Sequence, residues 1–332
     1  MYFLLGISIT LALLLIANMV IAVLASAAWK LASRLVAGFS AAARTEIIFA
    51  LRILPVAASL IFVAAYVIPA YLLLEPSASG EVVSTKLAMI AMISSLGVGI
   101  ALYRVVNTWF VTRRLVKSWL ADAEPIDLGD GIVPTYKIRH PFPVIAVTGI
   151  IRPRMFVADQ VFGSLDQNEI AAAVAHEHGH LRSRDNFKRT LLRICRDLVL
   201  LPVGKSLDRD WADNAESAAD EFAARAGGSK ALDLASALIK ITRIVPANSA
   251  PAMPLASFVT DGQNADVTSR VRALVRLSDH CSDWKEARLL GLSPSVILWG
   301  VGLVFILVLP FIDNGLYVST HDGIERFVQF LQ

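Results

Sequence analysis

Hydrophobic residues gather in long blocks along this chain instead of being dispersed as in a soluble core. Residues 2–29 carry no charge, and three further segments, 53–74, 87–103 and 293–312, are also free of charged side chains. A helix needs about 20 apolar residues to cross the hydrocarbon core of a bilayer. The pattern therefore predicts four transmembrane helices, near residues 3–27, 50–73, 87–110 and 293–313.

The charged residues between these blocks predict the orientation of the chain. If successive spans alternate in direction, every basic cluster falls on one side of the membrane, and the positive-inside rule makes that side cytoplasmic. Both termini are then extracytoplasmic. Arg52 and Arg104, at the ends of two spans, are expected to reach the lipid headgroups. The basic clusters are Lys30, Arg34 and Arg44, then Arg113, Arg114 and Lys117, and last Lys285 and Arg288.

The first block has two other interpretations. A cleaved signal peptide would fit Ala25-Ser26-Ala27 as a cleavage site, but the segment lacks a basic start, and its apolar run exceeds the typical length of about 7–15 residues. A buried helix of a large soluble core is the second alternative, and the length of the block disfavours it. We therefore favour a membrane span.

Composition agrees with a membrane protein. Hydrophobic residues make up 55% of the 332 residues and charged residues only 18%, against about 25% charged residues in soluble domains. The net charge of +3 is too small to indicate a nucleic-acid partner. Cys195 and Cys281 match no zinc or redox spacing and are interpreted as buried or free thiols. The spans carry no acid near their middle, which argues against a transporter.

The predicted cytoplasmic segment, residues 111–292, has the pattern of an α+β domain. Residues 140–157 alternate short apolar runs with Gly and Pro, as in a small β-hairpin. Asp166 and Glu169 have the spacing of a capping box and predict the start of a helix that ends near residue 184. Residues 187–203 are expected to pack on the core or lie on the membrane surface. Further helices are predicted at about 208–226, 230–245 and 264–278.

The helix predicted to start at Asp166 and to end near residue 184 contains an HExxH motif, His176-Glu177-His178-Gly179-His180. Positions i and i+4 of a helix share one face, so the outer two imidazoles can reach a single ion. Zinc suits two imidazoles and one carboxylate, with a fourth position open for water. Glu177 is placed to take a proton from that water. His178 points off this face and is expected to face solvent or to lie beside the ligands.

The third ligand is sought in Trp211 to Arg225 (WADNAESAADEFAAR), where Glu216 and Asp220 are also four residues apart. Glu216 would complete a His-His-Glu set, and Asp220 would hold the far nitrogen of a ligand histidine in one tautomer. The alternative is that both acids belong to a solvated helix face.

Several other polar residues are expected to lie outside the site. Asp213 and Glu221 are expected to face solvent. Asp185 is expected to cap a helix or to pair with Arg182 or Arg184 rather than to bind metal. His140 and His280 are interpreted as ordinary polar residues.

These motifs resemble the integral-membrane zinc metallopeptidases of the β-lactam-sensor signal-transducer family. That family is similar in turn to the membrane proteases that include prenyl-protein endopeptidases and bacterial heat-shock membrane proteases. The matching stretches are HPFPVIAVTGIIRPRMFV, LDQNEIAAAVAHEHGHLRSRDN and AESAADEFA, together with the spans before and after them.

The resemblance implies a gluzincin-type metalloprotease domain inserted between spans three and four. It implies that zinc is held by His176, His180 and Glu216, and that Glu177 is the general base. It also implies that a strand within 144–149 or 154–158 is an edge that pairs with an extended peptide substrate.

One departure concerns the sensor domain that this family carries after its last span. Only residues 314–332 follow here, so β-lactam sensing is not supported. Ile324, Phe327, Val328 and Leu331 keep helical spacing, and this short extracytoplasmic tail is expected to lie on the outer membrane surface.

The expected function is that of a zinc-dependent endopeptidase of a cell inner membrane, cleaving a protein at the cytosolic face. Regulated proteolysis or signalling is the favoured use, with a transcriptional repressor as one possible substrate and a second membrane protein supplying the signal. The alternatives are a quality-control protease for membrane proteins and a non-catalytic scaffold in which zinc holds two helices together.

Overall fold

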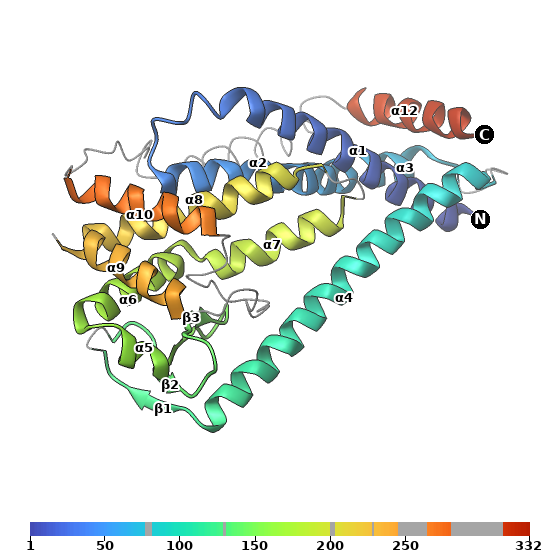
Figure 1. The fold of residues 1–332 in the computed structure, drawn as a ribbon. Coiled ribbons are helices and arrows are strands. Elements are labelled where there is room, and N and C mark those ends of the chain that lie inside the picture. Colours follow the sequence, from blue (N-terminus) through green and yellow to red (C-terminus); the bar gives the residue numbers. More distant parts are fainter. Residues whose placement is uncertain (77–81, 129–130, 200–202, 228, 245–263, 280–314) are drawn as a thin grey trace.

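The computed structural model describes residues 1–76, 82–128, 131–199, 203–227, 229–244, 264–279 and 315–332. It is mostly helical, with a small sheet after the first long helices (Figure 1). Three helical segments are long and apolar enough to cross a membrane, Tyr2–Ala32, Ala41–Leu74 and Thr85–Ala121. They correspond to the first three predicted spans. The fourth, near 293–313, lies outside the described residues.

The first three helical segments are longer than the apolar blocks that predicted them. α1 covers Tyr2–Ala32. α2 (Ala41–Phe62) starts nine residues before the predicted span because the Ser40 hydroxyl accepts a hydrogen bond from the Ala43 N–H at 3.3 Å and caps it. It continues through a π-helical turn, Val63–Val67, into α3 (Ile68–Leu74). α4 (Thr85–Ala121) runs past the predicted end at residue 110.

A four-stranded sheet follows α4 in the order β1-β2-β4-β3. β3 (Ile145–Thr148) and β4 (Arg154–Ala158) form the predicted antiparallel hairpin, and β3 is an edge strand. Gly149 makes the turn at a φ of +97°, where an added Cβ would lie 3.0 Å from the Arg152 carbonyl oxygen. β4 lies between β2 and β3, so the expectation that residues 154–158 could be an edge is wrong. β1 is Glu124–Ile126 and β2 is Thr135–Ile138.

Helices α5 to α10 complete the unit around the sheet. α6 begins at the predicted capping box, in which Asp166 accepts from the Glu169 N–H and Glu169 accepts from the Asp166 N–H, both at 2.9 Å. The hairpin strands are buried against α6 and α9 in one apolar core. The helices are α5 (Asp159–Ser164), α6 (Gln167–Ser183), α7 (Asp185–Asp197), α8 (Lys205–Arg225), α9 (Lys230–Ile244) and α10 (Asn264–Asp279).

α7 and α8 pack directly on the apolar helices (Figure 1). Arg52 of α2 is 2% exposed, and its Nε lies 2.7 Å from Asp208 Oδ1 on α8. Arg104 of α4 lies 2.5 Å from Asp197 at the end of α7. The expectation that Arg52 reaches the lipid headgroups is therefore wrong, because its side chain is buried against Asp208, whereas the Arg104 side chain is 58% exposed and its contact with headgroups stays a prediction.

The last described helix, α12 (Gly315–Leu331), also packs on protein. Ile324, Val328 and Leu331 are buried in one cluster with residues of α1, of the π-helical turn, of α3 and of α4. These apolar side chains are thus covered by helices of the same chain, and the position of the tail on the outer membrane surface stays a prediction.

Only one of the two cysteines lies among the described residues. Cys195 of α7 is a buried free thiol, and burial raises its pKa to about 11. Cys195 therefore agrees with the prediction of a buried or free thiol. Cys281 lies outside the described residues.

Candidate metal centre

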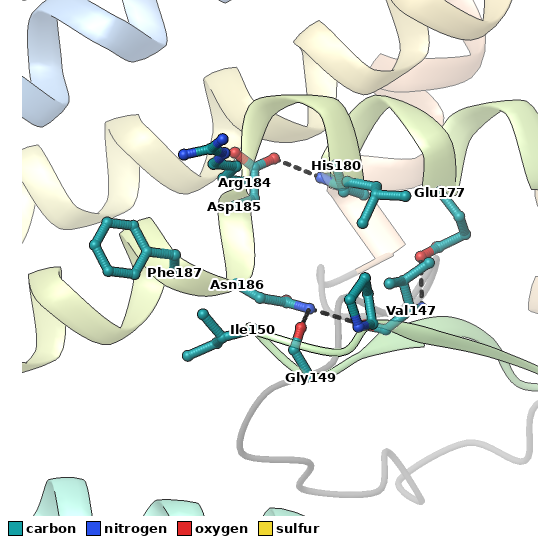
Figure 2. A pocket seen from close by; sticks show the side chains of 11 residues that line it. Val147, Gly149, Ile150, Glu177, His180, Arg184, Asp185, Asn186 and Phe187 are labelled. Carbon is teal, nitrogen blue, oxygen red and sulfur yellow. Dashed lines mark hydrogen bonds and ion pairs between the residues drawn. The ribbon is translucent and has the colours of Figure 1, made fainter. Parts of the chain in front are cut away.

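Glu177 lies in α6 on the side that faces the edge strand (Figure 2). Its side chain is fully buried, and Oε2 accepts a hydrogen bond from the Val147 N–H of β3 at 3.1 Å. The other oxygen, Oε1, has no hydrogen-bond partner among the described residues. Burial raises the pKa of this carboxyl group above its usual value, against the opposing effect of the neighbouring histidines. Such a shift moves a carboxylate toward the pKa range of a general base.

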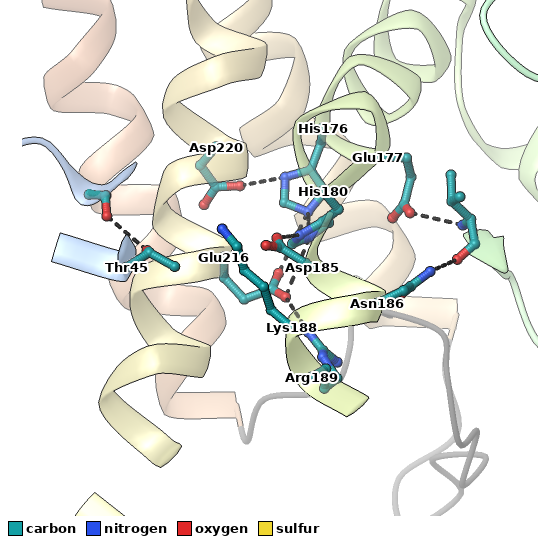
Figure 3. Close-up of polar contacts among 12 residues, drawn as sticks. Thr45, His176, Glu177, His180, Asp185, Asn186, Lys188, Arg189, Glu216 and Asp220 are labelled. Carbon is teal, nitrogen blue, oxygen red and sulfur yellow. Dashed lines mark hydrogen bonds and ion pairs between the residues drawn. The ribbon is translucent and has the colours of Figure 1, made fainter. Parts of the chain in front are cut away.

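His176 and His180 lie one turn apart on the adjacent part of α6, and both are buried (Figure 3). Their Nε2 atoms are 3.2 Å apart. Each Nδ1 faces a carboxylate, since His176 Nδ1 lies 2.9 Å from Asp220 Oδ1 and His180 Nδ1 lies 2.7 Å from Asp185 Oδ2. A proton on each Nδ1 leaves both Nε2 lone pairs directed into the same space.

Glu216 of α8 supplies a carboxylate at this point. Its oxygens lie 3.6 Å from His176 Nε2 and 3.5 Å from His180 Nε2. Ligand atoms of these three residues lie within 4.8 Å of one another. Two imidazole lone pairs and a carboxylate repel one another unless a cation lies between them, so the donor set fits a metal ion.

The charges around the cluster favour a cation in the same way. Burial alone would lower the pKa of His180, but the charge of Glu216 and the hydrogen bonds to Asp185 and Glu216 outweigh it and raise that pKa to about 10. The pKa of Glu216 is held well below its usual value, because both histidines and Arg270 outweigh its burial. The carboxylates that raise the pKa of His180 favour positive charge in this space and therefore also a bound metal cation.

Arg270 of α10 was not anticipated from the sequence. Its guanidinium binds Asp220 through two bonds, Nε to Oδ2 at 2.9 Å and Nη2 to Oδ1 at 2.7 Å. Nη1 also lies 3.2 Å from Glu216 Oε2. One arginine therefore holds Glu216 and Asp220, the two acids of α8 that face the histidines, in place. Its segment, TSRVRALVR, carries three arginines, and no local signal separates this one from the others.

Two further residues near the site can be compared with the expectation. Asp185 does not pair with Arg182 or Arg184 as its main contact but binds His180, because the turn between α6 and α7 brings it back over the imidazole. His178 is 8% exposed, so of its two expected positions the one facing solvent is wrong and the one beside the ligands stays a prediction.

Gly179 sets the distance between the two helices that carry the cluster. A Cβ at this position would lie 2.9 Å from the Ala219 Cα and 3.2 Å from its Cβ. α6 and α8 can approach this closely because Gly179 has no side chain where it meets Ala219 and the Phe222 Cβ. The residue inside the HExxH motif therefore helps bring Glu216 to the histidines.

Asn186, the second residue of α7, closes the edge of the sheet beside Glu177. Its Nδ2 donates to the Val147 carbonyl oxygen at 2.9 Å and lies 3.4 Å from that of Gly149 (Figure 2). The outward-facing polar groups of Val147 are thus bound by Glu177 and Asn186. Sequence reasoning missed Asn186, which has no motif of its own.

The model of Peptidase family M48 matches residues 146–325. These 180 residues (325 − 146 + 1) are more than half of the 332-residue chain. The chain belongs to Peptidase family M48. The matched segment of this M48 protein runs from β3 to α12 and includes Glu177, the three clustered residues and Asp220. A search of curated proteins finds no match. The family makes the chain a metallopeptidase, and the narrower likeness to the β-lactam-sensor family stays a prediction.

Proposed function

We propose that this M48 protein is a membrane-embedded zinc-dependent endopeptidase. The observation that carries the proposal is the buried cluster of His176, His180 and Glu216 beside a second carboxylate, Glu177, which contacts the edge strand of a sheet. The cluster can hold an ion, and Glu177 remains available for chemistry. The position of the pair beside an edge strand suits a polypeptide substrate.

Zinc is the metal we assign to the cluster. Two imidazole nitrogens and one carboxylate oxygen are a usual catalytic zinc set, which leaves a coordination position for water or substrate. When bound, zinc supplies Lewis acidity at the scissile carbonyl and activates water at neutral pH. Asp220 and Asp185 hold the two imidazoles in the tautomer that a metal ligand requires.

Glu177 acts as the general base in this proposal. The hydrogen bond from Val147 N–H fixes Oε2, and Oε1 is the oxygen with no partner among the described residues. Oε1 is therefore the atom that takes a proton from the attacking water and passes it to the leaving amine.

The substrate is an extended segment of protein that adds to β3. Val147 directs both its N–H and its carbonyl away from β4, as an edge strand must for pairing. A substrate strand has to displace Asn186 from the Val147 carbonyl before its own N–H can bind there. Asn186 therefore occupies the pairing edge in the absence of substrate.

The protease unit acts close to the membrane in this proposal. α7 and α8 contact α1, α2 and α4 through Arg52, Arg104 and Trp29, so the cluster is coupled to the apolar helices rather than carried on a flexible linker. With the orientation indicated by the basic clusters, cleavage takes place at the cytosolic face of an inner membrane, and both termini are extracytoplasmic. Regulated cleavage of a protein such as a repressor is the use we favour, and broad cleavage of damaged membrane proteins is the alternative.

The test compares the wild type with Glu177→Gln, both purified in detergent. Cleavage of an unfolded fluorescent reporter, self-cleavage and zinc content are measured on the same samples. We expect equal zinc in both proteins and cleavage by the wild type alone. Cleavage by the variant at the wild-type rate would refute the assigned base. Full zinc without cleavage in either protein would support the scaffold, and absence of zinc in both would remove the metal assignment.

A further inference from the structure

A cavity of about 370 Å³ opens beside Glu177 and His180, between β3 and the start of α7 (Figure 2). We propose that it receives an apolar side chain of the substrate residue next to the cleaved bond, and that Phe187 is the residue that selects it. This inference rests on the proposed peptidase function and adds the substrate preference.

The cavity lies next to the residues that act on the cleaved bond in the proposed function. Glu177 and His180 are themselves part of its lining, together with Val147 of the edge strand. A substrate strand paired with Val147 therefore places a side chain directly at the mouth. The volume is within the range of about 300–1,000 Å³ found for small-molecule sites, so it can enclose a large aliphatic or aromatic side chain.

The lining of the cavity is largely apolar. Two of its polar residues are already engaged, because Asp185 binds His180 and the Asn186 amide binds Val147. Glu177 and His180 belong to the catalytic site in this proposal, and Arg184, the remaining charged residue of the lining, lies on the exposed side of the turn at a φ of 55°. Burying a charged substrate side chain among these residues would leave it without a matched partner. The apolar lining residues are Val147, Ile150, Pro153, Leu181 and Phe187.

Apolar surface continues outward from the cavity. Phe187 is 46% exposed and Ile150 is 41% exposed, and Ile151 at the neighbouring turn is 91% exposed. Exposed apolar residues that surround the mouth of a cavity mark a binding surface rather than a random surface composition. The occupant that fits is an apolar segment of an unfolded or membrane-derived polypeptide, because its path along β3 leads over these residues.

The first experiment maps the preference of the full-length wild type in detergent. Its cut sites in an unfolded reporter are identified by mass spectrometry, and quenched peptides are then made that differ only in one residue beside the cut. We expect kcat/KM for Leu or Phe to exceed that for Asp or Lys by about 10- to 100-fold on one side of the bond.

The second experiment assigns the preference to the cavity. Phe187→Lys should shift the ratio of kcat/KM for Asp over Leu upward by about tenfold, because an ammonium group now lies in the lining. Phe187→Leu should keep the apolar preference. Leu232→Lys, a similarly exposed residue of α9 at 49% exposure, is the matched control and should leave the ratio unchanged. Zinc content and melting temperature are recorded for every variant.

The outcomes separate this inference from the proposed function. Cleavage without any preference at the flanking residues, or a preference of the wild type for acidic residues through Arg184, would overturn the assigned cavity and leave the peptidase intact. A ratio in Phe187→Lys equal to that of the wild type would also overturn it. Failure of the wild type to cleave any peptide would overturn both.

Discussion

The carboxylates of α8 form two sets with different tasks. In the first set Glu216 and Asp220 meet the histidines of α6 and Arg270 of α10. In the second set Asp208 binds Arg52, and Glu221 accepts a hydrogen bond from the Ala41 N–H at the start of α2, at 3.2 Å. The first set surrounds a position for an ion. The second set joins α8 to an apolar helix.

The difference shows how one acidic helix serves both chemistry and assembly. In the first set the carboxylates converge with other lone pairs, so the arrangement is completed only by a cation. In the second set each carboxylate has its own donor, as does Asp210, whose Oδ2 lies 2.6 Å from Trp29 Nε1. We therefore expect substitutions in the two sets to separate metal binding from stability.

The largest effect is expected from Glu216→Gln. A neutral amide replaces the charged ligand, so bound zinc and cleavage should both be lost. Metal content by mass spectrometry is compared with that of Asp208→Asn, which removes a carboxylate bound to Arg52 and should keep its zinc. Full zinc in Glu216→Gln would show that the ion, if any, is held by other residues.

Asp220→Asn and Asp185→Asn should each weaken zinc binding by about 10- to 100-fold, because the carboxylate no longer holds the imidazole proton. Competition with a chelator measures the affinity. Asp213→Asn, an exposed position of the same helix, is the control. Unchanged affinity in both site variants would remove the proposed role of these carboxylates.

Arg52→Met is expected to act on stability. Breaking a buried ion pair from one side costs about 3–5 kcal/mol, since the remaining charge loses its partner. Thermal unfolding in detergent should show a lower melting temperature, with zinc stoichiometry unchanged. The double variant Arg52→Met/Asp208→Leu should recover part of the loss. A large fall in the zinc content of the folded variant would show that the Arg52–Asp208 pair also affects metal binding.

The smallest effect is expected at Glu169, a residue of α6 that belongs to neither set of carboxylates on α8. Burial opposes its ionisation, but hydrogen bonds from Lys240 at 2.8 Å and from Ser236 at 2.6 Å, with the Asp166 N–H, hold its pKa below the usual value. Because the folded pKa is lowered, this stabilisation is present above the unfolded pKa of about 4.3 and is lost as the pH falls through the folded value.

Glu169→Gln tests this dependence. The variant should melt a few degrees below the wild type at pH 7, consistent with about 1–3 kcal/mol for hydrogen bonds to a charged group. The gap should narrow as the pH is lowered below about 4. A gap that is constant from pH 7 to pH 3 would mean that the charge of Glu169 contributes nothing.

The spacing of residues along the sequence was sufficient to predict several elements of the fold and one feature of the site. The apolar blocks predicted three long helices, the capping box predicted the start of α6, and the Gly- and Pro-rich segment predicted the β3–β4 hairpin. The i, i+4 spacing also predicted that His176 and His180 share one face of α6. These features depend on hydrogen bonds and side-chain directions within a few residues, so a short stretch of sequence is enough to specify them.

Partners distant in sequence were decided only by the tertiary structure. Arg270 lies 50 residues after Asp220, and Arg52 lies 156 residues before Asp208. The sheet order, which makes β3 the edge, and the approach of α8 to Gly179 are also set by packing. A charged residue that will be buried against a distant partner has the same local sequence as one that faces water, so its environment exists only in the folded chain.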